Sequence, residues 1–279
     1  MKRQYVMNPG YMLVPDGTRV LFVSQDNVDP GVKHDDNWTS YIHPFNAQLL
    51  AFFNGKNTLE EVIVKASDFF GLTINEIEKI VTGYIENEKS FAISYNTNYM
   101  HFPVNVLVNK TKIQNKYKTY CVEDFILNGE ADLTTRRTSF PLSINLELTM
   151  KCHTDCIYCY ANRKMHNKEM PLEMVLSIIR QAKKIGVVNF DISGGEVLLH
   201  PHYKEVISEL LINGYTPFIS TKVPVKKDKL QTLKNIGVKE IQISLDSINP
   251  ETLSKILNVS SNYADAIKDT VRFTEEVGL

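Results

Sequence analysis

The sequence predicts an α/β protein, an incomplete (βα) partial barrel preceded by a small winged-helix-like α+β domain. Two observations predict this. In the first 95 residues, strand patterns come first and three capped helices follow, whereas from residue 141 short strand patterns alternate with helical ones. Such alternation is typical of a parallel sheet. We therefore expect a first domain at 1–95, a connector at 96–140 and a barrel at 141–279.

The first domain opens with a hairpin pattern. Residues 10–24, GYMLVPDGTRVLFVS, place two apolar runs on either side of PDG, and a turn sequence between two such runs is typical of a β-hairpin. A third strand is expected within WTSYIH, residues 38–43. Three strands so close together in the sequence can form a small sheet.

Three helices are expected next, and their ends are well marked. PFNAQLLAFFNG has Pro44 near its start and a glycine just past its end, as helices often do. Two further helical segments, TLEEVIVKASDFFG and TINEIEKIVTGYIENEK, open with capping boxes formed by Thr58 with Glu61 and Thr73 with Glu76.

This order of elements, with YIHPFNAQLLAFFNGKNTLEEVI at its centre, resembles the PqqD-like domain, also called the RiPP recognition element. The resemblance covers about the first 95 residues. It implies that the leader of a precursor peptide binds as an added strand beside residues 39–43, in a groove whose wall lies within 73–90. A DNA-binding winged helix and a plain docking module are the alternatives. The third helical segment is acidic, which argues against DNA.

From residue 141, polar and apolar residues alternate within each predicted strand, as in SINLELT. Strands buried on both faces have nearly continuous apolar runs instead. In a barrel the apolar side chains face the outer helices and the polar ones face the lumen, so a large polar ligand is expected inside. The strands are expected at 143–149, 187–193, 216–221 and 240–246, with helices at 171–185, 201–213, 226–236 and 250–257.

Three of the four cysteines lie in one loop after the first barrel strand. Cys152, Cys156 and Cys159 follow the carboxyl end of that strand with the spacing C-x3-C-x2-C, where βα-barrel active sites are built. Three thiolates on one tight loop can hold three corners of a cubane iron–sulfur cluster and leave its fourth iron without a protein ligand. A structural zinc site is the alternative, but it needs a fourth ligand. His153, the nearest candidate, cannot easily turn to the same metal as Cys152.

The loop sequence CHTDCIYCY resembles the CxxxCxΦC signature of the radical S-adenosylmethionine (radical SAM) superfamily, with Tyr158 as the aromatic residue. The resemblance implies a 4Fe-4S cluster on the three cysteines and S-adenosyl-L-methionine as the second cofactor. An external one-electron reductant would supply the electron that cleaves the sulfonium to a 5'-deoxyadenosyl radical. The radical chemistry belongs to the cofactor, and the protein positions it.

Three further motifs match the family position by position. SGGE resembles its GGE motif, in which Gly194 and Gly195 let the backbone approach the methionine part and Glu196 accepts from the ammonium. STKVP stands where relatives have Thr-Asn-Gly beside the ribose, and Lys222 departs from that pattern. The carboxylate-binding arginine of relatives has no clear counterpart, with Asn258 near its place. The implied cofactor contacts on the last two strands are Ser220, Thr221, Ser244 and Asp246. Ser244 and Asp246 could instead be buried hydrogen-bonding groups within the barrel.

Four βα units are present, and no cysteine follows Cys159. Relatives that join both modules usually carry a C-terminal SPASM or twitch region, so we expect this chain to be a fragment of a longer maturase. The predicted function is a radical SAM enzyme that modifies a ribosomally made precursor peptide. The alternative is a non-catalytic or truncated peptide-binding protein that retains the leader-binding domain.

The composition excludes two classes of partner. With 31 basic and 32 acidic residues the formal net charge is -1, which gives no reason to expect nucleic acid. No stretch approaches the roughly 18 continuous apolar residues that cross a bilayer, and no signal peptide pattern opens the chain. We therefore expect a cytoplasmic protein with no membrane partner, in a compartment where clustered cysteines bind metal more often than they form disulfides.

Overall fold

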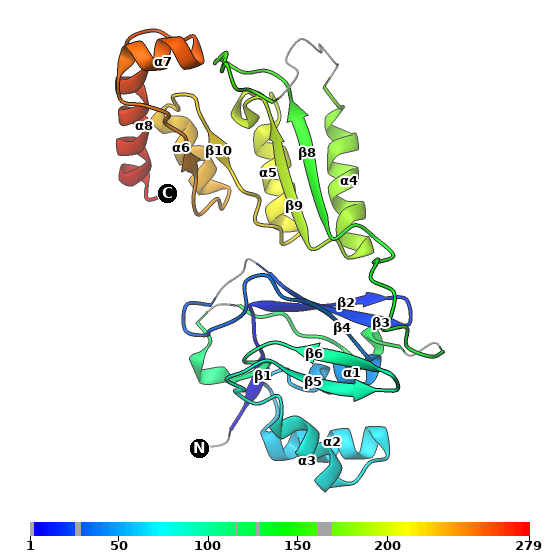
Figure 1. Ribbon diagram of the computed structural model, residues 1–279. Coiled ribbons are helices and arrows are strands. Elements are labelled where there is room, and N and C mark those ends of the chain that lie inside the picture. Colours follow the sequence, from blue (N-terminus) through cyan, green and yellow to red (C-terminus); the bar gives the residue numbers. More distant parts are fainter. Residues whose placement is uncertain (1–2, 26–28, 115, 127–128, 161–168) are drawn as a thin grey trace. The chain divides into compact units, whose positions relative to one another are not determined.

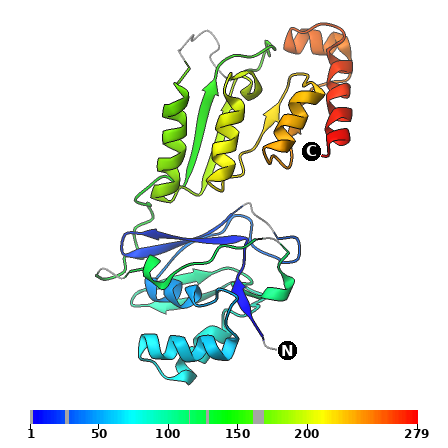
Figure 2. The same ribbon diagram turned by 180° about the vertical axis from the view of Figure 1, so that it is seen from behind.

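The computed structural model describes residues 3–25, 29–114, 116–126, 129–160 and 169–279. The chain divides into two compact units, Met1–Phe140 (unit 1) and Pro141–Leu279 (unit 2). Figure 1 shows their elements, and Figure 2 shows the same elements from behind. The division falls where the alternation of strand and helix begins in the sequence.

The hairpin and third strand predicted for unit 1 are confirmed. Strands β2 (Tyr11–Asp16), β3 (Arg19–Ser24) and β4 (Thr39–Ile42) form an antiparallel sheet in that order. Gly17, in the turn between β2 and β3, has a φ of 65°, which glycine adopts without a steric penalty. Among the described strands, β4 is hydrogen-bonded to β3 alone, so it forms an edge of this sheet.

The predicted connector at 96–140 is part of unit 1, so the expected boundary at residue 95 is wrong. That boundary falls in the turn between two paired strands, β5 (Phe91–Tyr95) and β6 (Asn98–Phe102). Strand β7 (Leu107–Asn109) pairs with β1 (Tyr5–Met7), which lies about a hundred residues earlier. Such remote pairing leaves no local signal. The stretch also contains the short 3-10 helices η1 (Lys110–Lys112) and η2 (Val122–Asp124).

The three predicted helices of unit 1 are present as α1 (Pro44–Ala51), α2 (Leu59–Phe70) and α3 (Ile74–Thr82), and both capping boxes form. Helix α3 is shorter than expected. Gly83 caps it, and the next residue, Tyr84, is fully buried. Ile85 then forms a bridge with Leu107, so the chain leaves the helix to join the sheet region.

This course of the chain changes the groove predicted between residues 39–43 and 73–90. Helix α3 packs on α2, whereas β4 contacts β6. In both views α2 and α3 lie at the far side of unit 1 from the β2-β3-β4 sheet (Figures 1 and 2). The backbone N–H of His43, just after β4, donates to Met100 Sδ of β6 at 3.1 Å. The wall beside β4 is therefore formed by β6 and not by α3.

Unit 2 alternates strand and helix in the predicted order, although the strands predicted at 216–221 and 240–246 are each reduced to two residues. Strand β8 (Ser143–Thr149) pairs in parallel with β9 (Asn189–Gly194), and β10 (Ser220–Thr221) with β11 (Gln242–Ile243). The expected lumen residues Asn145 and Glu147 are exposed. The apolar residues between them pack against the helices. The helices are α4 (Leu172–Ile185), α5 (Tyr203–Ile212), α6 (Lys227–Asn235), α7 (Pro250–Leu257) and α8 (Tyr263–Val277), with the 3-10 turn η3 at Val197–Leu199.

The four strands form two parallel pairs and not one sheet in the described residues. The strand predicted at 216–221 is reduced to its last two residues, Ser220 and Thr221. Just before it, the Phe218 N–H donates to the Asp191 carboxylate of β9 at 3.1 Å instead of to a strand carbonyl. The Asp191 carboxylate thus accepts the hydrogen bond that a backbone carbonyl of β9 would accept in a continuous barrel sheet.

No helix in the described part of either unit is long and apolar enough to span a membrane.

Candidate cofactor site

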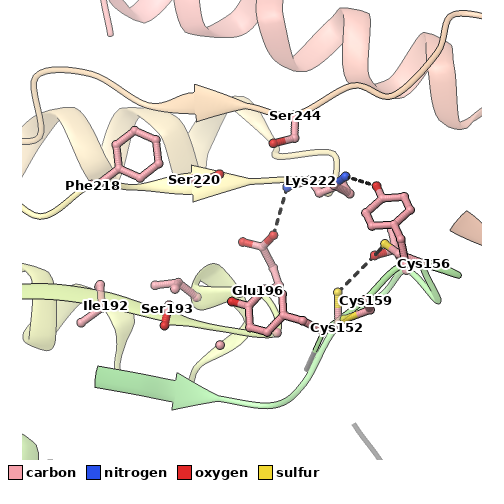
Figure 3. A pocket seen from close by; sticks show the side chains of 16 residues that line it. Cys152, Cys156, Cys159, Ile192, Ser193, Glu196, Phe218, Ser220, Lys222 and Ser244 are labelled. Atoms are coloured by element: carbon pink, nitrogen blue, oxygen red, sulfur yellow. Dashed lines mark hydrogen bonds between the residues drawn. The ribbon is translucent and has the colours of Figure 1, made fainter. Parts of the chain in front are cut away.

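A pocket of about 370 Å³ lies where the strands of unit 2 end. It brings together the cysteine loop after β8, the glycine-rich end of β9 and the ends of β10 and β11 (Figure 3). Of the predicted site residues, nine line it: Cys152, Cys156, Tyr158, Cys159, Gly194, Gly195, Glu196, Ser220 and Ser244. The other two, Thr221 and Asp246, are not among the lining residues but bond to residues that are.

The cysteine loop is held in place by the end of α7. The backbone N–H groups of Asp155 and Ile157 donate to the carbonyls of Leu257 and Ile256, at 2.8 and 2.9 Å. The last carbonyls of a helix have no partner within it, so they are available for such bonds. Cys156 also packs against the apolar residues of α7 and α8. The loop is therefore ordered by a helix about a hundred residues later in the chain.

The three thiols of the cysteine loop lie at one pocket and are of the donor type that an iron–sulfur cluster requires. Cys152 Sγ and Cys156 Sγ lie 3.2 and 3.4 Å from the same hydroxyl, Thr154 Oγ1, and Cys159 lines the same pocket. Within the described residues, no group of three or more His, Cys, Asp or Glu side chains is close enough to hold one ion. A cubane presents a separate iron to each thiolate, whereas zinc gathers four ligands around one centre. The donor set is thus the one expected for the cluster.

The two glycines of SGGE are required by the backbone on which they pack. A Cβ on Gly194 would overlap the Thr149 carbonyl oxygen, and one on Gly195 would overlap that of Lys151. The N–H of Gly195 donates to Thr149 O at 2.7 Å and that of Glu196 to Lys151 O at 2.7 Å. The end of β9 therefore passes in close contact with the start of the cysteine loop, which only glycine allows. The sequence predicted that these glycines let the backbone approach the cofactor. In the structure they let the end of β9 approach residues 149–151.

Glu196 joins the two strand pairs. Its side chain is buried, and its carboxylate accepts from the Leu198 N–H at 3.2 Å, the Thr221 hydroxyl at 2.9 Å and the Lys222 N–H at 3.3 Å. Burial raises the pKa of Glu196 above that of an ordinary glutamate, although these hydrogen bonds oppose the shift. A carboxylate has about four acceptor positions, and these hydrogen bonds occupy three of them. Thr221, which is not among the lining residues, positions this carboxylate.

Lys222, which departs from the family pattern, is the cation of the pocket wall. Its Nζ donates to Asp246 Oδ2 at 2.9 Å and to the Tyr158 hydroxyl at 2.5 Å, and Tyr158 donates to Asp246 Oδ1 at 2.5 Å. Burial alone would lower the pKa of Lys222, but the bonds to Asp246 and Tyr158 outweigh it and raise that pKa. For Asp246, burial would raise the pKa and the bonds from Lys222 and Tyr158 lower it.

Sequence reasoning did not identify the residues that support this wall. Tyr263 of α8 donates its hydroxyl hydrogen bond to the Lys222 carbonyl and belongs to the apolar cluster that covers Cys156. The sequence contained one indication of a role for Lys222, namely its position directly after the strand β10. Asn258, expected near the cofactor carboxylate, adopts a left-handed conformation at the end of α7, and its N–H donates to Ser254 O. It does not line the described pocket.

Residues 146–279 match the family model described as the radical SAM superfamily. Residues 146–279 therefore form a radical SAM domain. Such domains use a 4Fe-4S cluster and S-adenosyl-L-methionine, so the cubane expected on the cysteine loop is the cofactor of its family.

Curated relatives of the chain are enzymes of this superfamily named for one reaction. A probable GTP 3',8-cyclase of Methanococcus maripaludis (strain C5) is 31% identical over 140 residues, which are 49% of this chain and 46% of that protein. A probable GTP 3',8-cyclase of Methanosarcina acetivorans is 27% identical over 142 residues, 49% of this chain and 42% of that protein. The chain thus spans less than half the length of these relatives.

Solved structures with a similar fold cover both units. SuiB of Streptococcus suis has a TM-score of 0.57 and 16% identity, and the match covers 98% of this chain and 54% of SuiB. SuiB bound to S-adenosylmethionine has a TM-score of 0.58 at the same coverage and identity. SuiB bound to its precursor peptide SuiA has a TM-score of 0.56, covering 99% and 55%. At this identity the likeness shows a shared α/β fold.

Proposed function

We propose that this protein is a radical SAM enzyme that modifies a ribosomally made precursor peptide. One observation supports the peptide most strongly. The fold of SuiB, whose structure is known with a precursor peptide, extends over 99% of the chain and so includes unit 1. The similarity to the GTP 3',8-cyclases covers about half of the chain.

In this proposal, unit 2 holds the cofactors. Cys152, Cys156 and Cys159 would hold the cluster, which with bound S-adenosylmethionine supplies a radical able to abstract hydrogen once an external reductant provides one electron. Glu196 would accept from the methionine ammonium. The remaining contacts would come from Gly194, Gly195, Tyr158, Ser220, Ser244 and Asp246, with Thr221 fixing Glu196.

Unit 1 would capture the leader of the peptide. Strand β4 forms one edge of its sheet within the described residues, and an extended peptide can add to such an edge through backbone hydrogen bonds. The added strand would run beside Thr39–Ile42, with β6 in place of α3 as the neighbouring wall. Leader binding by β4 and hydrogen abstraction at the cofactor site would therefore take place in different units.

The test is reconstitution with iron and sulfide under anaerobic conditions, followed by S-adenosylmethionine, dithionite and synthetic peptides encoded by short reading frames beside the gene. We expect about four irons per chain, release of 5'-deoxyadenosine, and a peptide product lighter by two hydrogens when a crosslink forms. Cys156→Ala should lose the cluster and keep peptide binding. A chain that binds no iron after reconstitution would contradict the proposal.

A nucleotide substrate is the second candidate, because the curated relatives are named for GTP cyclisation. GTP in place of the peptide in the same assay decides between the two. Consumption of GTP with release of 5'-deoxyadenosine would show that the substrate is a nucleotide and not a peptide. Peptide binding with an intact cluster and no cofactor cleavage would favour a non-catalytic peptide-binding protein.

A further inference from the structure

The pocket wall contains a connection that the family pattern does not assign. Lys222 bonds to four different segments of unit 2. Its N–H donates to Glu196, its carbonyl accepts from Tyr263, and its Nζ reaches Tyr158 and Asp246. A single residue thus links the cysteine loop, the end of β9, the end of β11 and helix α8.

The side-chain part of this connection spans the pocket wall. Tyr158 stands between Cys156 and Cys159 in the sequence, and Asp246 follows β11, 88 residues away. Nζ lies 5.0 Å from the centroid of the Tyr158 ring, and the two hydrogen bonds of Tyr158 and Lys222 converge on the two oxygens of one carboxylate. Hydrogen bonds with charged partners are stronger than neutral ones, so this triangle restrains the cysteine loop.

The surroundings distinguish Lys222 from a surface lysine. Its side chain is 24% exposed and that of Asp246 is 22% exposed. Lys222 is also the single Lys, Arg or His among the described residues that line the pocket. An ammonium group has three donors, and two of them are directed to Tyr158 and Asp246. The ammonium group is therefore held at the pocket wall by two partners from different segments.

We propose that Lys222 is a positioning residue that clamps Tyr158 to Asp246, so that the cysteine loop and the cofactor-facing wall are ordered before S-adenosylmethionine binds. The idea rests on the proposed function for its ligand. The clamp itself is a property of the chain without any ligand. Preorganisation of this kind improves binding by removing the cost of ordering the loop when the ligand arrives.

The first experiment uses the reduced, metal-free chain and does not depend on cofactor binding. In the loop, the backbone amides of Asp155, Ile157 and Cys159 donate hydrogen bonds to backbone carbonyls. In Lys222→Met, hydrogen–deuterium exchange in a peptide covering 152–160 should quicken about tenfold, the effect of losing charged hydrogen bonds. Lys222→Arg should restore most of the protection.

The matched control is Lys227→Met. Lys227 also bonds to a carboxylate, Glu276, at 2.5 Å, but this pair is about half exposed and lies away from the pocket. It should leave exchange in the loop unchanged. Unchanged exchange in Lys222→Met, or a rise spread evenly over α4 and α5, would overturn the proposal because the residue would then have no role or only a general stabilising one.

The second experiment measures equilibrium binding of S-adenosylmethionine to the reconstituted protein. Lys222→Met should bind about tenfold more weakly with unchanged iron content. Adding Tyr158→Phe to it should cause little further loss, since residues of one network are not additive. Equal affinity in Lys222→Met and the original chain would overturn the proposal. Failure of the original chain to bind S-adenosylmethionine would contradict the proposed function and leave the exchange result to judge the clamp.

Discussion

The Arg19–Asp16 pair of unit 1 and the Lys222–Asp246 pair of unit 2 have the same N–O distance, 2.9 Å, in different surroundings. The side chains of Arg19 and Asp16 are 5% and 2% exposed. Those of Lys222 and Asp246 are about a quarter exposed, and Lys222 lines the pocket. The first pair is therefore enclosed by protein, whereas the second faces a cavity.

Backbone groups of the same unit satisfy the enclosed pair. The Arg19 guanidinium lies 3.6 Å from the centroid of the Tyr41 ring and donates to the carbonyls of Asp132, Thr135 and Arg137. Asp16 accepts from the backbone N–H and the hydroxyl of Ser139. The pair thus holds residues 132–139 against the hairpin, just before the boundary between the units. The further hydrogen bonds of this pair go mostly to backbone groups of unit 1. Those of the Lys222 and Asp246 side chains go to the Tyr158 hydroxyl instead.

The structural role of each ion pair depends on the other hydrogen bonds that its atoms make. A buried pair whose donors meet carbonyls of the same unit maintains the fold, and removal of one partner leaves a buried charge. A partly exposed pair at a cavity can restrain a loop and still reach a ligand. Variants of the two units, taken in decreasing order of expected effect, test whether the two pairs differ in this way.

Arg19→Met should have the largest effect. It leaves Asp16 buried without its cation and three carbonyls without their donor, so the free energy of unfolding of unit 1 should fall by about 3–5 kcal/mol. Trp38, the single tryptophan, lies in unit 1, so its fluorescence during urea unfolding reports on this unit.

Arg3→Met is the matched control for that variant. Arg3 and Glu60 are mostly exposed and 3.9 Å apart, and such pairs contribute little to stability. Equal urea midpoints for Arg19→Met and Arg3→Met would show that the enclosed pair is no more important than a surface one.

Gly195→Ala should have the next largest effect, because its Cβ would overlap the Lys151 carbonyl. Overpacking of this kind costs about 1–3 kcal/mol, and the shifted loop should bind less iron after reconstitution. The counterpart in unit 1 is Gly83→Ala, where the nearest atom, Ile80 O, would be 3.3 Å away and φ is already helical. Hydrogen exchange in each unit compares the two, and similar changes would refute the steric argument.

The smallest effect is a pH dependence of opposite sign in the two units. Burial would raise the pKa of Asp16, but the hydrogen bonds from Ser139 and Arg19 outweigh it, so that pKa is lower than usual. Its contribution to stability is present above the ordinary value of 3.8 and is lost as the pH falls through the lowered pKa. The Trp38 signal of unit 1 should therefore show increasing stability from strongly acid pH upward.

Glu196 in unit 2 reverses this dependence. Burial raises its pKa, so between 4.5 and the raised value the folded chain holds more protons than the unfolded one. Stability of unit 2 from this group therefore decreases as the pH rises through that window and levels off above it. Hydrogen exchange in β9, corrected for the intrinsic effect of pH, measures it, and Glu196→Gln should abolish the slope. A slope unchanged in Glu196→Gln would assign the dependence to another group.

Local chemistry in the sequence was sufficient to predict much of this protein. The capping boxes at Thr58 and Thr73 form because a side chain and a backbone amide three residues apart find each other without help from the rest of the fold. Strand β8 was predicted with its exact bounds, since alternation of polar and apolar residues reflects one covered face. The cysteine spacing and SGGE likewise placed the site at the ends of β8 and β9.

Contacts between distant segments required the tertiary structure. The pairing of β1 with β7, the loss of the boundary at residue 95, and the end of α3 at Gly83 all depend on segments that meet only after folding. For the same reason, the sequence did not predict the partners of Lys222 or the hydrogen bonds between the cysteine loop and α7. Local sequence patterns were enough to predict which residues would carry chemistry, whereas the packing of remote segments decided how those residues are held, because hydrogen bonds and steric contacts act over a few ångströms in space regardless of the separation along the chain.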